Sequence, residues 1–203
     1  MIVVIVRILI ASVGGQGGLT LARTIAEAAV VSGLSARTGE TLGMAQRYGS
    51  VVSYVQVGTE VYTPKFLPGE ADYLVGLELV EALRNIHYLK ESGVALVADE
   101  YRPPFTMSSE RPQSTRAEIL DALKSSTSRL LVVPARRLAV EAGSARALNM
   151  VMLGALNAAS KLFKHSVVEE AIKRALPPRA VEASIKAYYS GFKYAESLLE
   201  PSK

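Results

Sequence analysis

The residues best suited to chemistry form a glycine-rich stretch near the amino terminus, Ser12-Val13-Gly14-Gly15-Gln16-Gly17-Gly18. The apolar run 7–11 predicts a buried strand before it, and the Ala-rich segment 19–31, free of Pro and Gly, predicts a helix after it. A glycine turn between a strand and a helix can direct several backbone N–H groups into one concavity at the helix amino terminus. Residues 14–18 therefore predict a site for a phosphate or a carboxylate group.

Two known phosphate-binding motifs can be compared with this stretch. A dinucleotide-binding fingerprint requires glycine at positions 12, 14 and 17, and the chain has Gly14 and Gly17 but Ser12. Glu40 follows at a distance suited to a ribose hydroxyl. A P-loop is excluded, because neither Lys-Ser nor Lys-Thr follows Gly18. A purely architectural role, in which the glycines only allow a tight turn into a close-packed helix, stays open.

A second candidate segment, residues 41–50, follows the next predicted strand and has the sequence Thr-Leu-Gly-Met-Ala-Gln-Arg-Tyr-Gly-Ser. Arg47 supplies its positive charge, and a planar guanidinium binds a carboxylate or a phosphate through two parallel hydrogen bonds. An ordinary surface ion pair is the alternative role for Arg47, and such pairs contribute little to stability. The glycine turn and Arg47 together favour an anion site at one edge of the predicted sheet.

Other residue types that support catalysis are sparse or poorly spaced. The two histidines, His87 and His165, lie in separate predicted helices and lack metal-ligand spacing. The sequence has no Gly-x-Ser-x-Gly motif, so a hydrolase triad is not indicated. Asp99 and Glu100 end a predicted strand, where open α/β sheets place their ligands. Capping of a turn or a helix is the alternative role for these two carboxylates.

Apolar runs that alternate with helical segments predict the elements that hold these residues. Strands are expected at 7–11, 35–40, 51–58, 72–77, 94–98 and 130–133, and helices at 19–31, 78–90, 117–124, 148–163, 166–176 and 179–199. Alternation along 51–58 predicts one buried face, and 58–61 predicts a turn into another short strand. We expect a Rossmann-like, doubly wound α/β fold with a mostly parallel sheet, in one domain over residues 1–203. Its sheet core would occupy 1–134, and C-terminal helices would occupy 135–203.

Length and composition restrict the class of protein. The 203 residues suffice for one full hydrophobic core. The absence of cysteine excludes disulfides, thiolate nucleophiles and iron–sulfur clusters held by this chain alone, and it fits a cytoplasmic location. The apolar run 1–13 is too short to span a membrane. The net charge is +4, but the sequence has no basic stripe interleaved with aromatic residues, so we do not expect it to bind nucleic acid. We do not expect it to bind a membrane either.

Three segments carry a resemblance to a known family. Residues 14–18, Gly-Gly-Gln-Gly-Gly, and residues 40–53, Glu-Thr-Leu-Gly-Met-Ala-Gln-Arg-Tyr-Gly-Ser-Val-Val-Ser, resemble the gamma-type domain of 2-oxoacid:ferredoxin oxidoreductases, and above all the small subunits of the indolepyruvate type. Residues 149–154, Asn-Met-Val-Met-Leu-Gly, are similar to the same family. Three residues depart from its usual pattern, namely Ser12 in place of Gly, Tyr48 within Arg-Gly-Gly, and Gln56 in place of Arg.

The resemblance implies an accessory subunit of an enzyme that converts an aryl 2-oxoacid to an acyl-coenzyme A by oxidative decarboxylation and reduces ferredoxin. A large partner subunit would carry thiamine diphosphate and the iron–sulfur clusters, since this chain has neither a Gly-Asp-Gly thiamine motif nor cysteine. This chain would hold no cofactor alone, and its residues would contact coenzyme A or the partner's site. The site residues expected on this basis are Gly14, Gly15, Gln16, Gly17, Gly18, Glu40, Gly43, Met44, Gln46, Arg47, Gly49 and Ser50.

Two other functions stay open at this level. One is a stand-alone dinucleotide-binding oxidoreductase that uses Gly14, Gly17 and Glu40. The other is a non-enzymatic protein whose C-terminal helices assemble a homo-oligomer. The aromatic residues between positions 188 and 194 would then form a partner-binding face instead of packing against their own domain.

Overall fold

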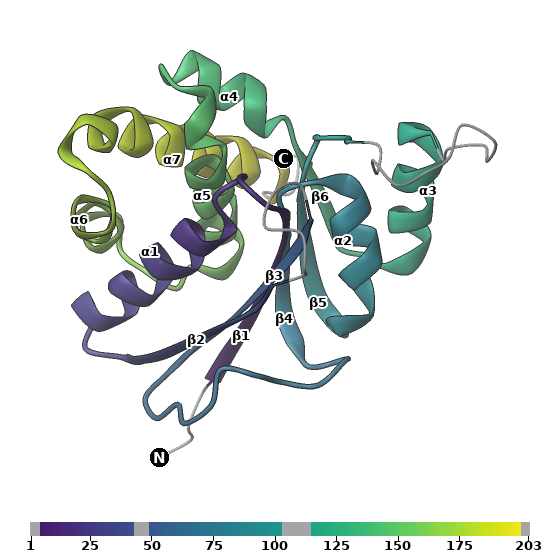
Figure 1. Cartoon of the computed structure of the whole chain (residues 1–203), viewed down its shortest axis with the longest axis horizontal. Coiled ribbons are helices and arrows are strands. Elements are labelled where there is room, and N and C mark those ends of the chain that lie inside the picture. Colours follow the sequence, from purple (N-terminus) through teal and green to yellow (C-terminus); the bar gives the residue numbers. More distant parts are fainter. Residues whose placement is uncertain (1–4, 43–48, 103–114, 200–203) are drawn as a thin grey trace.

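A six-stranded sheet forms the centre of the computed structural model, which describes residues 5–42, 49–102 and 115–199. The strands are β1 (Ile5–Val13), β2 (Ser35–Leu42), β3 (Ser50–Gly58), β4 (Ala71–Gly76), β5 (Leu89–Ala98) and β6 (Leu130–Val133). Their order across the sheet is β2-β3-β1-β4-β5-β6 (Figure 1). Strand β3 pairs antiparallel with β1 and β2, while the β1–β4, β4–β5 and β5–β6 pairs are parallel. The prediction of a mostly parallel sheet is therefore confirmed.

Helices cover both faces of this sheet (Figure 1). One layer contains α1 (Gly18–Val31), α4 (Ala135–Glu141), η2 (Ala145–Ala147), α5 (Leu148–Ser160), α6 (His165–Ala175) and α7 (Pro178–Leu199). The other layer contains α2 (Leu79–Asn85), η1 (Ile86–Tyr88) and α3 (Arg116–Ser126). The doubly wound α/β class with C-terminal helices is thus confirmed. Among the described residues, no helix combines the length and the apolar character needed to cross a bilayer.

Strand β1 lies near the middle of the sheet and contributes to both cores. Ile8 and Ile10 pack with α1 and the C-terminal helices, whereas Leu9 and Ala11 pack with α2. All four side chains are fully buried, because successive side chains of a strand point to opposite faces and both faces are covered here. The carboxyl end of this strand leads directly into the glycine stretch, so a rigid part of the fold holds the candidate site.

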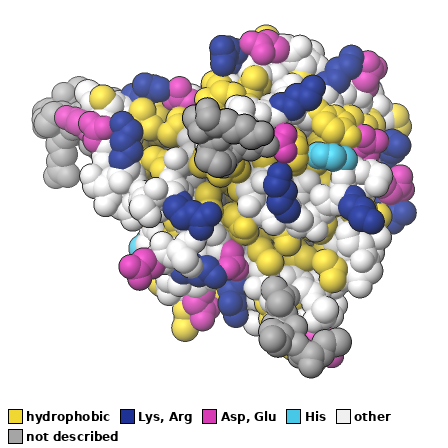
Figure 2. All heavy atoms as spheres, turned by 180° about the vertical axis from the view of Figure 1, so that it is seen from behind, with side chains coloured by type: hydrophobic (Ala, Val, Ile, Leu, Met, Phe, Trp, Pro, Cys, Tyr) yellow, Lys and Arg dark blue, Asp and Glu magenta, His cyan; other side chains and the backbone are white. Residues whose placement is uncertain are grey.

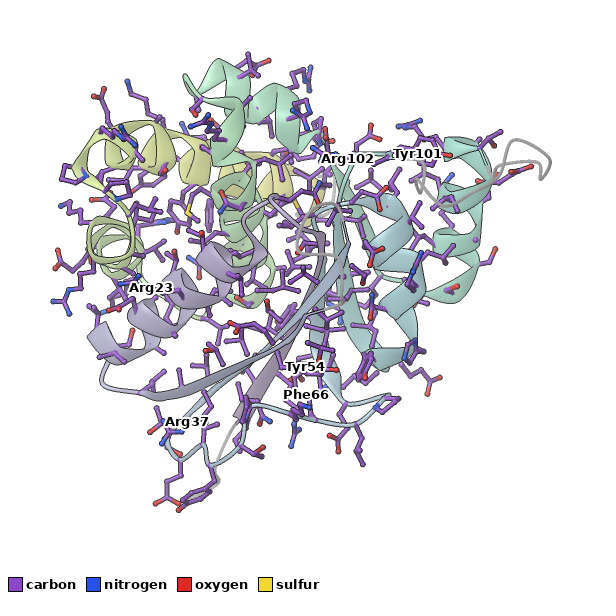
Figure 3. All side chains as sticks on the ribbon, viewed as in Figure 1. Arg23, Arg37, Tyr54, Phe66, Tyr101 and Arg102 are labelled. Carbon is purple, nitrogen blue, oxygen red and sulfur yellow. The ribbon has the colours of Figure 1, made fainter. Side chains whose placement is uncertain are left out.

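Strand β3 differs from the prediction of one buried face, because Ser53–Gly58 are buried without interruption. The loop after β3 covers the second face. Gln56 donates from Nε2 to the carbonyl O of Lys65 at 3.1 Å, and the rings of Tyr54 and Phe66 meet edge to face with centroids 5.2 Å apart (Figure 3). The prediction that residues 58–61 turn into another short strand was wrong, since residues 59–70 form no strand in the described structure.

Two further predictions need correction. The helix expected at 78–90 is divided into α2 and η1, and residue 89 already belongs to β5. Helix α4 was missed, because its seven residues are too few for a helical period to stand out in the sequence. The remaining expected strands and helices occur with shifts at their ends.

Helices α5 and α7 approach each other closely at two glycines. A Cβ on Gly154 would lie 2.0 Å from the carbonyl O of Tyr188, and a Cβ on Gly191 would lie 1.9 Å from the carbonyl O of Val151. A side chain at either position would force the two backbones apart. The buried residues of these helices belong to the same core cluster as β1 and α1, so the C-terminal helices pack directly on the sheet part.

The aromatic residues of α7 pack partly inside the protein. Tyr188 is fully buried, and its hydroxyl accepts a hydrogen bond from Nδ2 of Asn157 at 2.8 Å and lies 2.7 Å from Nδ1 of His165. Burial raises the pKa of Tyr188 to about 12. The ring of His165 contacts that of Phe192 with centroids 4.5 Å apart. These contacts favour packing within the domain as the role of Tyr188 and Phe192.

Candidate functional site

The glycine stretch forms the connection between β1 and α1 that the sequence predicts. Gly15 and Gly17 adopt φ values of 92° and 87°, in the left-handed region that favours glycine. Gly17 is the N-cap of α1, and within the described structure no side chain caps this end of the helix. The first N–H groups of the helix are therefore available to an acceptor from outside the chain.

Close contacts explain two of the glycines. A Cβ on Gly17 would lie 2.6 Å from Nδ2 of Asn149, and a Cβ on Gly18 would lie 2.5 Å from Oγ of Ser12. Ser12 thus fills the space beside Gly18. A Cβ on Gly15 would meet nothing within 4 Å, so the turn is open to its surroundings at that residue.

Gln16 holds the turn through both ends of its side-chain amide. Its Oε1 accepts from the N–H of Val13 at 2.8 Å, and its Nε2 donates to the carbonyl O of Leu77 at 3.0 Å. Leu77 directly follows β4, so Gln16 joins the carboxyl ends of two neighbouring parallel strands. The amide is already paired within the chain, and its role in the described structure is to support the turn.

A cavity of about 680 Å³ lies where the glycine turn, the end of β5 and the C-terminal helices meet. The backbone of residues 15–17 forms part of its wall, and residues 143–149 and the first turns of α7 form another part. Four arginines also line it, namely Arg102, Arg136, Arg146 and Arg179. Among the residues that the structure describes, the lining includes no Asp or Glu, so this part of the cavity wall is positively charged and suits an anionic ligand.

Charged side chains are distributed differently on the face shown in Figure 2 and in this cavity. Figure 2 shows Lys and Arg side chains scattered over that face among acidic and apolar ones. In the cavity, by contrast, four arginines lie in the lining together with the amino-terminal end of a helix. Charge of one sign is thus concentrated in the cavity and mixed over the face in Figure 2.

Glu100 holds one of these arginines in place. Nε of Arg136 donates to both carboxylate oxygens of Glu100 at 2.8 Å, and Nη2 forms an ion pair with the same group. The hydrogen bond to Glu100 raises the pKa of Arg136, although burial opposes the shift. The neighbouring Asp99 accepts from Nε and Nη2 of Arg116 at 2.8 and 2.7 Å. Both acidic residues at the end of β5 therefore bind arginines of this chain.

Glu40 lies away from the glycine turn. It pairs with Ser53 of β3, which in turn pairs with Ile10 of β1. In a dinucleotide-binding fold the strand with the acidic residue lies directly beside the first strand. Here β3 lies between them, which places Glu40 two strand spacings, or about 10 Å, from β1. The topology therefore does not favour the stand-alone dinucleotide-binding alternative.

The other expected residues divide into two groups. Gly49 accepts a hydrogen bond at its carbonyl O from the N–H of Gly14 at 2.8 Å, and Ser50 donates from Oγ to Glu81 at 2.5 Å. These two residues support the turn and α2 without lining the cavity. A second group lies outside the described residues, and its role stays a prediction: Gly43, Met44, Gln46 and Arg47. Within the described ranges, no group of three His, Cys, Asp or Glu side chains is placed to hold a metal ion.

Sequence reasoning missed the arginines of the cavity. Arg102 follows β5, Arg136 belongs to α4, Arg146 belongs to η2, and Arg179 opens α7. No local motif joins residues from four separate elements. The one available signal was Arg102, because it comes shortly after the carboxyl end of a predicted strand.

Comparison with known proteins agrees with this architecture. The family model described as pyruvate ferredoxin/flavodoxin oxidoreductase matches residues 7–194. Indolepyruvate oxidoreductase subunit IorB of Pyrococcus horikoshii is 36% identical over 196 residues, which cover 95% of this chain and 97% of the relative. The gamma subunit of a keto/oxoacid ferredoxin oxidoreductase from Geobacter sulfurreducens is similar in structure, with a TM-score of 0.71 at 25% identity over 95% of this chain and 99% of that chain.

The fold also occurs within a longer chain. A 2-oxoglutarate:ferredoxin oxidoreductase from Magnetococcus marinus matches with a TM-score of 0.70 at 19% identity, over 98% of this chain and 32% of that chain. The chain described here belongs to the pyruvate ferredoxin/flavodoxin oxidoreductase family. It is an accessory subunit of a 2-oxoacid:ferredoxin oxidoreductase of the indolepyruvate type, and so it is part of an enzyme complex. The family resemblance of residues 14–18, 40–53 and 149–154 is therefore confirmed.

Proposed function

We propose that the arginine-lined cavity binds the phosphate groups of coenzyme A, while a larger partner subunit holds thiamine diphosphate and the iron–sulfur clusters. One observation carries this proposal: four arginines and the amino-terminal end of α1 line one cavity, and the described residues of its lining include no Asp or Glu. Coenzyme A carries a diphosphate and a 3′-phosphate, and such a polyanion matches several cations and a helix amino terminus.

Charge compensation within the chain supports the same ligand class. Arg136 is paired with Glu100, whereas Arg102, Arg146 and Arg179 form no ion pair with the residues that the structure describes. Three positive charges therefore face the cavity without a counterion from this part of the chain. A ligand with several phosphate groups would neutralise them, and a single carboxylate would not.

The open side of the glycine turn supports a position for one phosphate. No described residue lies within 4 Å of a Cβ built on Gly15, and Gly15 and Gly17 line the cavity. Backbone N–H groups at this turn would bind the diphosphate, together with Arg146 and Arg179 of the same cavity lining. The M. marinus enzyme that shares this fold was solved with 2-oxoglutarate, coenzyme A and succinyl-CoA bound, which is consistent with the proposed ligand class.

In the proposed complex, this chain positions coenzyme A for the chemistry of its partner. Thiamine diphosphate, when bound in the larger subunit, supplies the decarboxylation of the 2-oxoacid. The clusters of that subunit would pass two electrons to ferredoxin, and the thiol of coenzyme A would take up the acyl group. The cysteine-free composition of the chain fits a cytoplasmic complex.

Binding of coenzyme A to the assembled complex tests the proposal. We expect Arg146→Gln or Arg179→Gln to weaken binding about ten- to hundredfold, as for the loss of a charge-assisted hydrogen bond. Arg37→Gln is the matched control, because it removes the same charge from β2 at a distance from the cavity (Figure 3). Isothermal titration calorimetry gives the dissociation constants. Equal affinity of the wild type and both cavity variants would contradict the proposal.

A further inference from the structure

We propose that Glu78 is a positioning residue for the cavity: its buried carboxylate fixes the backbone of Arg102 and thereby places that guanidinium at the cavity wall. The inference rests on the proposed function of the cavity. Glu78 does not line the cavity, and it follows β4 immediately before α2. It is 0% exposed, so its carboxylate must be used within the chain.

Two backbone N–H groups from separate elements bind this carboxylate. Oε2 accepts from the N–H of Glu81 at 2.9 Å, which caps α2. Oε1 accepts from the N–H of Arg102 at 2.9 Å, across 24 positions of the sequence. Capping of α2 requires only one oxygen. The second oxygen fixes the chain shortly after it leaves β5, at Arg102, which is one of the residues that line the cavity. Figure 3 labels Arg102 at the end of this strand.

A second hydrogen bond joins the same two segments in the opposite direction. The N–H of Leu79 donates to the carbonyl O of Glu100 at 2.8 Å. Together with the bond from Arg102 to Glu78, it forms a two-point clamp between the start of α2 and the end of β5. The side chain of Glu100 also holds Arg136. The clamp thus fixes Arg102 through its backbone and Arg136 through Glu100.

The clamp is joined to the glycine turn as well. Leu77, which precedes Glu78, accepts from Nε2 of Gln16 at 3.0 Å and donates from its own N–H to the carbonyl O of Ala11 at 2.8 Å. One hydrogen-bonded frame therefore connects the turn, Glu78 and Arg102. The frame holds the backbone of the turn and the backbone of Arg102 at a fixed separation, which limits where the Arg102 side chain can lie relative to the turn.

Glu81 provides a matched comparison on the same helix. It is also buried, at 6% exposure, and it accepts a hydrogen bond from Oγ of Ser50 and pairs with Arg84 at 3.6 Å. These partners lie outside the cavity lining. Loss of either carboxylate should weaken α2, but loss of Glu78 should also release Arg102.

The test compares Glu78→Gln, Glu81→Gln, Arg102→Ala and the double variant Glu78→Gln/Arg102→Ala, with coenzyme A as the probe for the assembled complex. Glutamine at position 78 presents one oxygen and one NH₂ group, so it cannot accept from both N–H groups. We expect Glu78→Gln to weaken binding at least about threefold and Glu81→Gln to change it less than about twofold. The double variant should bind no more weakly than Arg102→Ala, since non-additivity identifies residues that act through one another. Additive losses, or equal losses in Glu78→Gln and Glu81→Gln, would overturn the inference.

Hydrogen exchange at the backbone N–H of Arg102 separates this inference from the proposed function. Exchange should be faster in Glu78→Gln than in the wild type and unchanged in Glu81→Gln, whether or not coenzyme A binds. Unchanged exchange in Glu78→Gln would overturn the inference even if the cavity binds coenzyme A. A wild-type complex that binds no coenzyme A would contradict the proposed function instead. Glu78→Asp, whose shorter side chain cannot span both N–H groups, should give the same result if Glu78→Gln does not fold.

Discussion

The side-chain amide of Asn149 donates a hydrogen bond from Nδ2 to the carbonyl oxygen of Gly17 at 3.1 Å, across 132 positions of the sequence. The bond joins the first turn of α5 to the N-cap of α1. The same Nδ2 would lie 2.6 Å from a Cβ on Gly17. The two residues therefore fit together only without a side chain at position 17, and the C-terminal helices help to shape the glycine turn.

Gly17→Ala should destabilise the protein more than Gly15→Ala. Both glycines have φ near 90°, so alanine at either position costs about 1–2 kcal/mol of left-handed strain. At position 17 the new Cβ also collides with Asn149, whereas at position 15 it meets nothing within 4 Å. The free energy of unfolding in urea measures the difference. Equal losses in the two variants would show that Asn149 does not constrain the turn.

The stability of the wild type relative to Glu78→Gln should fall as the pH rises. Burial raises the pKa of the Glu78 carboxyl above its ordinary value, although backbone N–H groups donate to it. A carboxyl with a raised pKa in the folded state contributes most below the pKa of the unfolded state, and this contribution is lost as the pH rises through the folded pKa. Urea unfolding at several pH values between about 4 and 7 gives the difference in free energy. A difference that grows with pH would contradict the raised pKa.

Gly191→Ala should separate α5 from α7 and destabilise the core. Its Cβ would lie 1.9 Å from the carbonyl O of Val151, so the helix backbones must shift. Overpacking of this kind costs about 1–3 kcal/mol. Ser190→Ala is the control, because its half-buried side chain donates to the carbonyl O of Lys186 on the same helix and lies beside the glycine. Thermal unfolding compares the two variants, and similar midpoints would argue against a tight α5–α7 contact.

Local sequence patterns were sufficient to predict those strands, turns and helices whose conformation depends on neighbouring residues in the sequence. The strand, glycine turn and helix around residues 5–31 were predictable, because the apolar run and the glycines determine them within a few residues. The position of Glu40 was not predictable, because β3 enters the sheet between β1 and β2 and strand order depends on long-range pairing. The polar residue Gln56 suggested that one face of β3 is exposed. The loop that covers this face contains Lys65 and comes later in the chain, so the local pattern could not indicate its burial.

The candidate site was predictable only in its backbone part. The turn at Gly14–Gly18 forms within one connection, whereas Arg102, Arg136, Arg146 and Arg179 come from elements that meet only after the C-terminal helices pack on the sheet. Glu78 could not be found from its sequence context, because an acidic residue before a helix is a common N-cap. Its second hydrogen bond, to Arg102, depends on the pairing of β4 with β5.

Steady-state kinetics of the assembled complex test the central claim, that this subunit holds coenzyme A for its partner. In the double variant Arg146→Gln/Arg179→Gln, we expect the KM for coenzyme A to rise at least about tenfold while the KM for the 2-oxoacid stays unchanged. The chain without its partner should reduce no ferredoxin with any 2-oxoacid. An unchanged KM for coenzyme A, or a rise confined to the KM for the 2-oxoacid, would contradict the account.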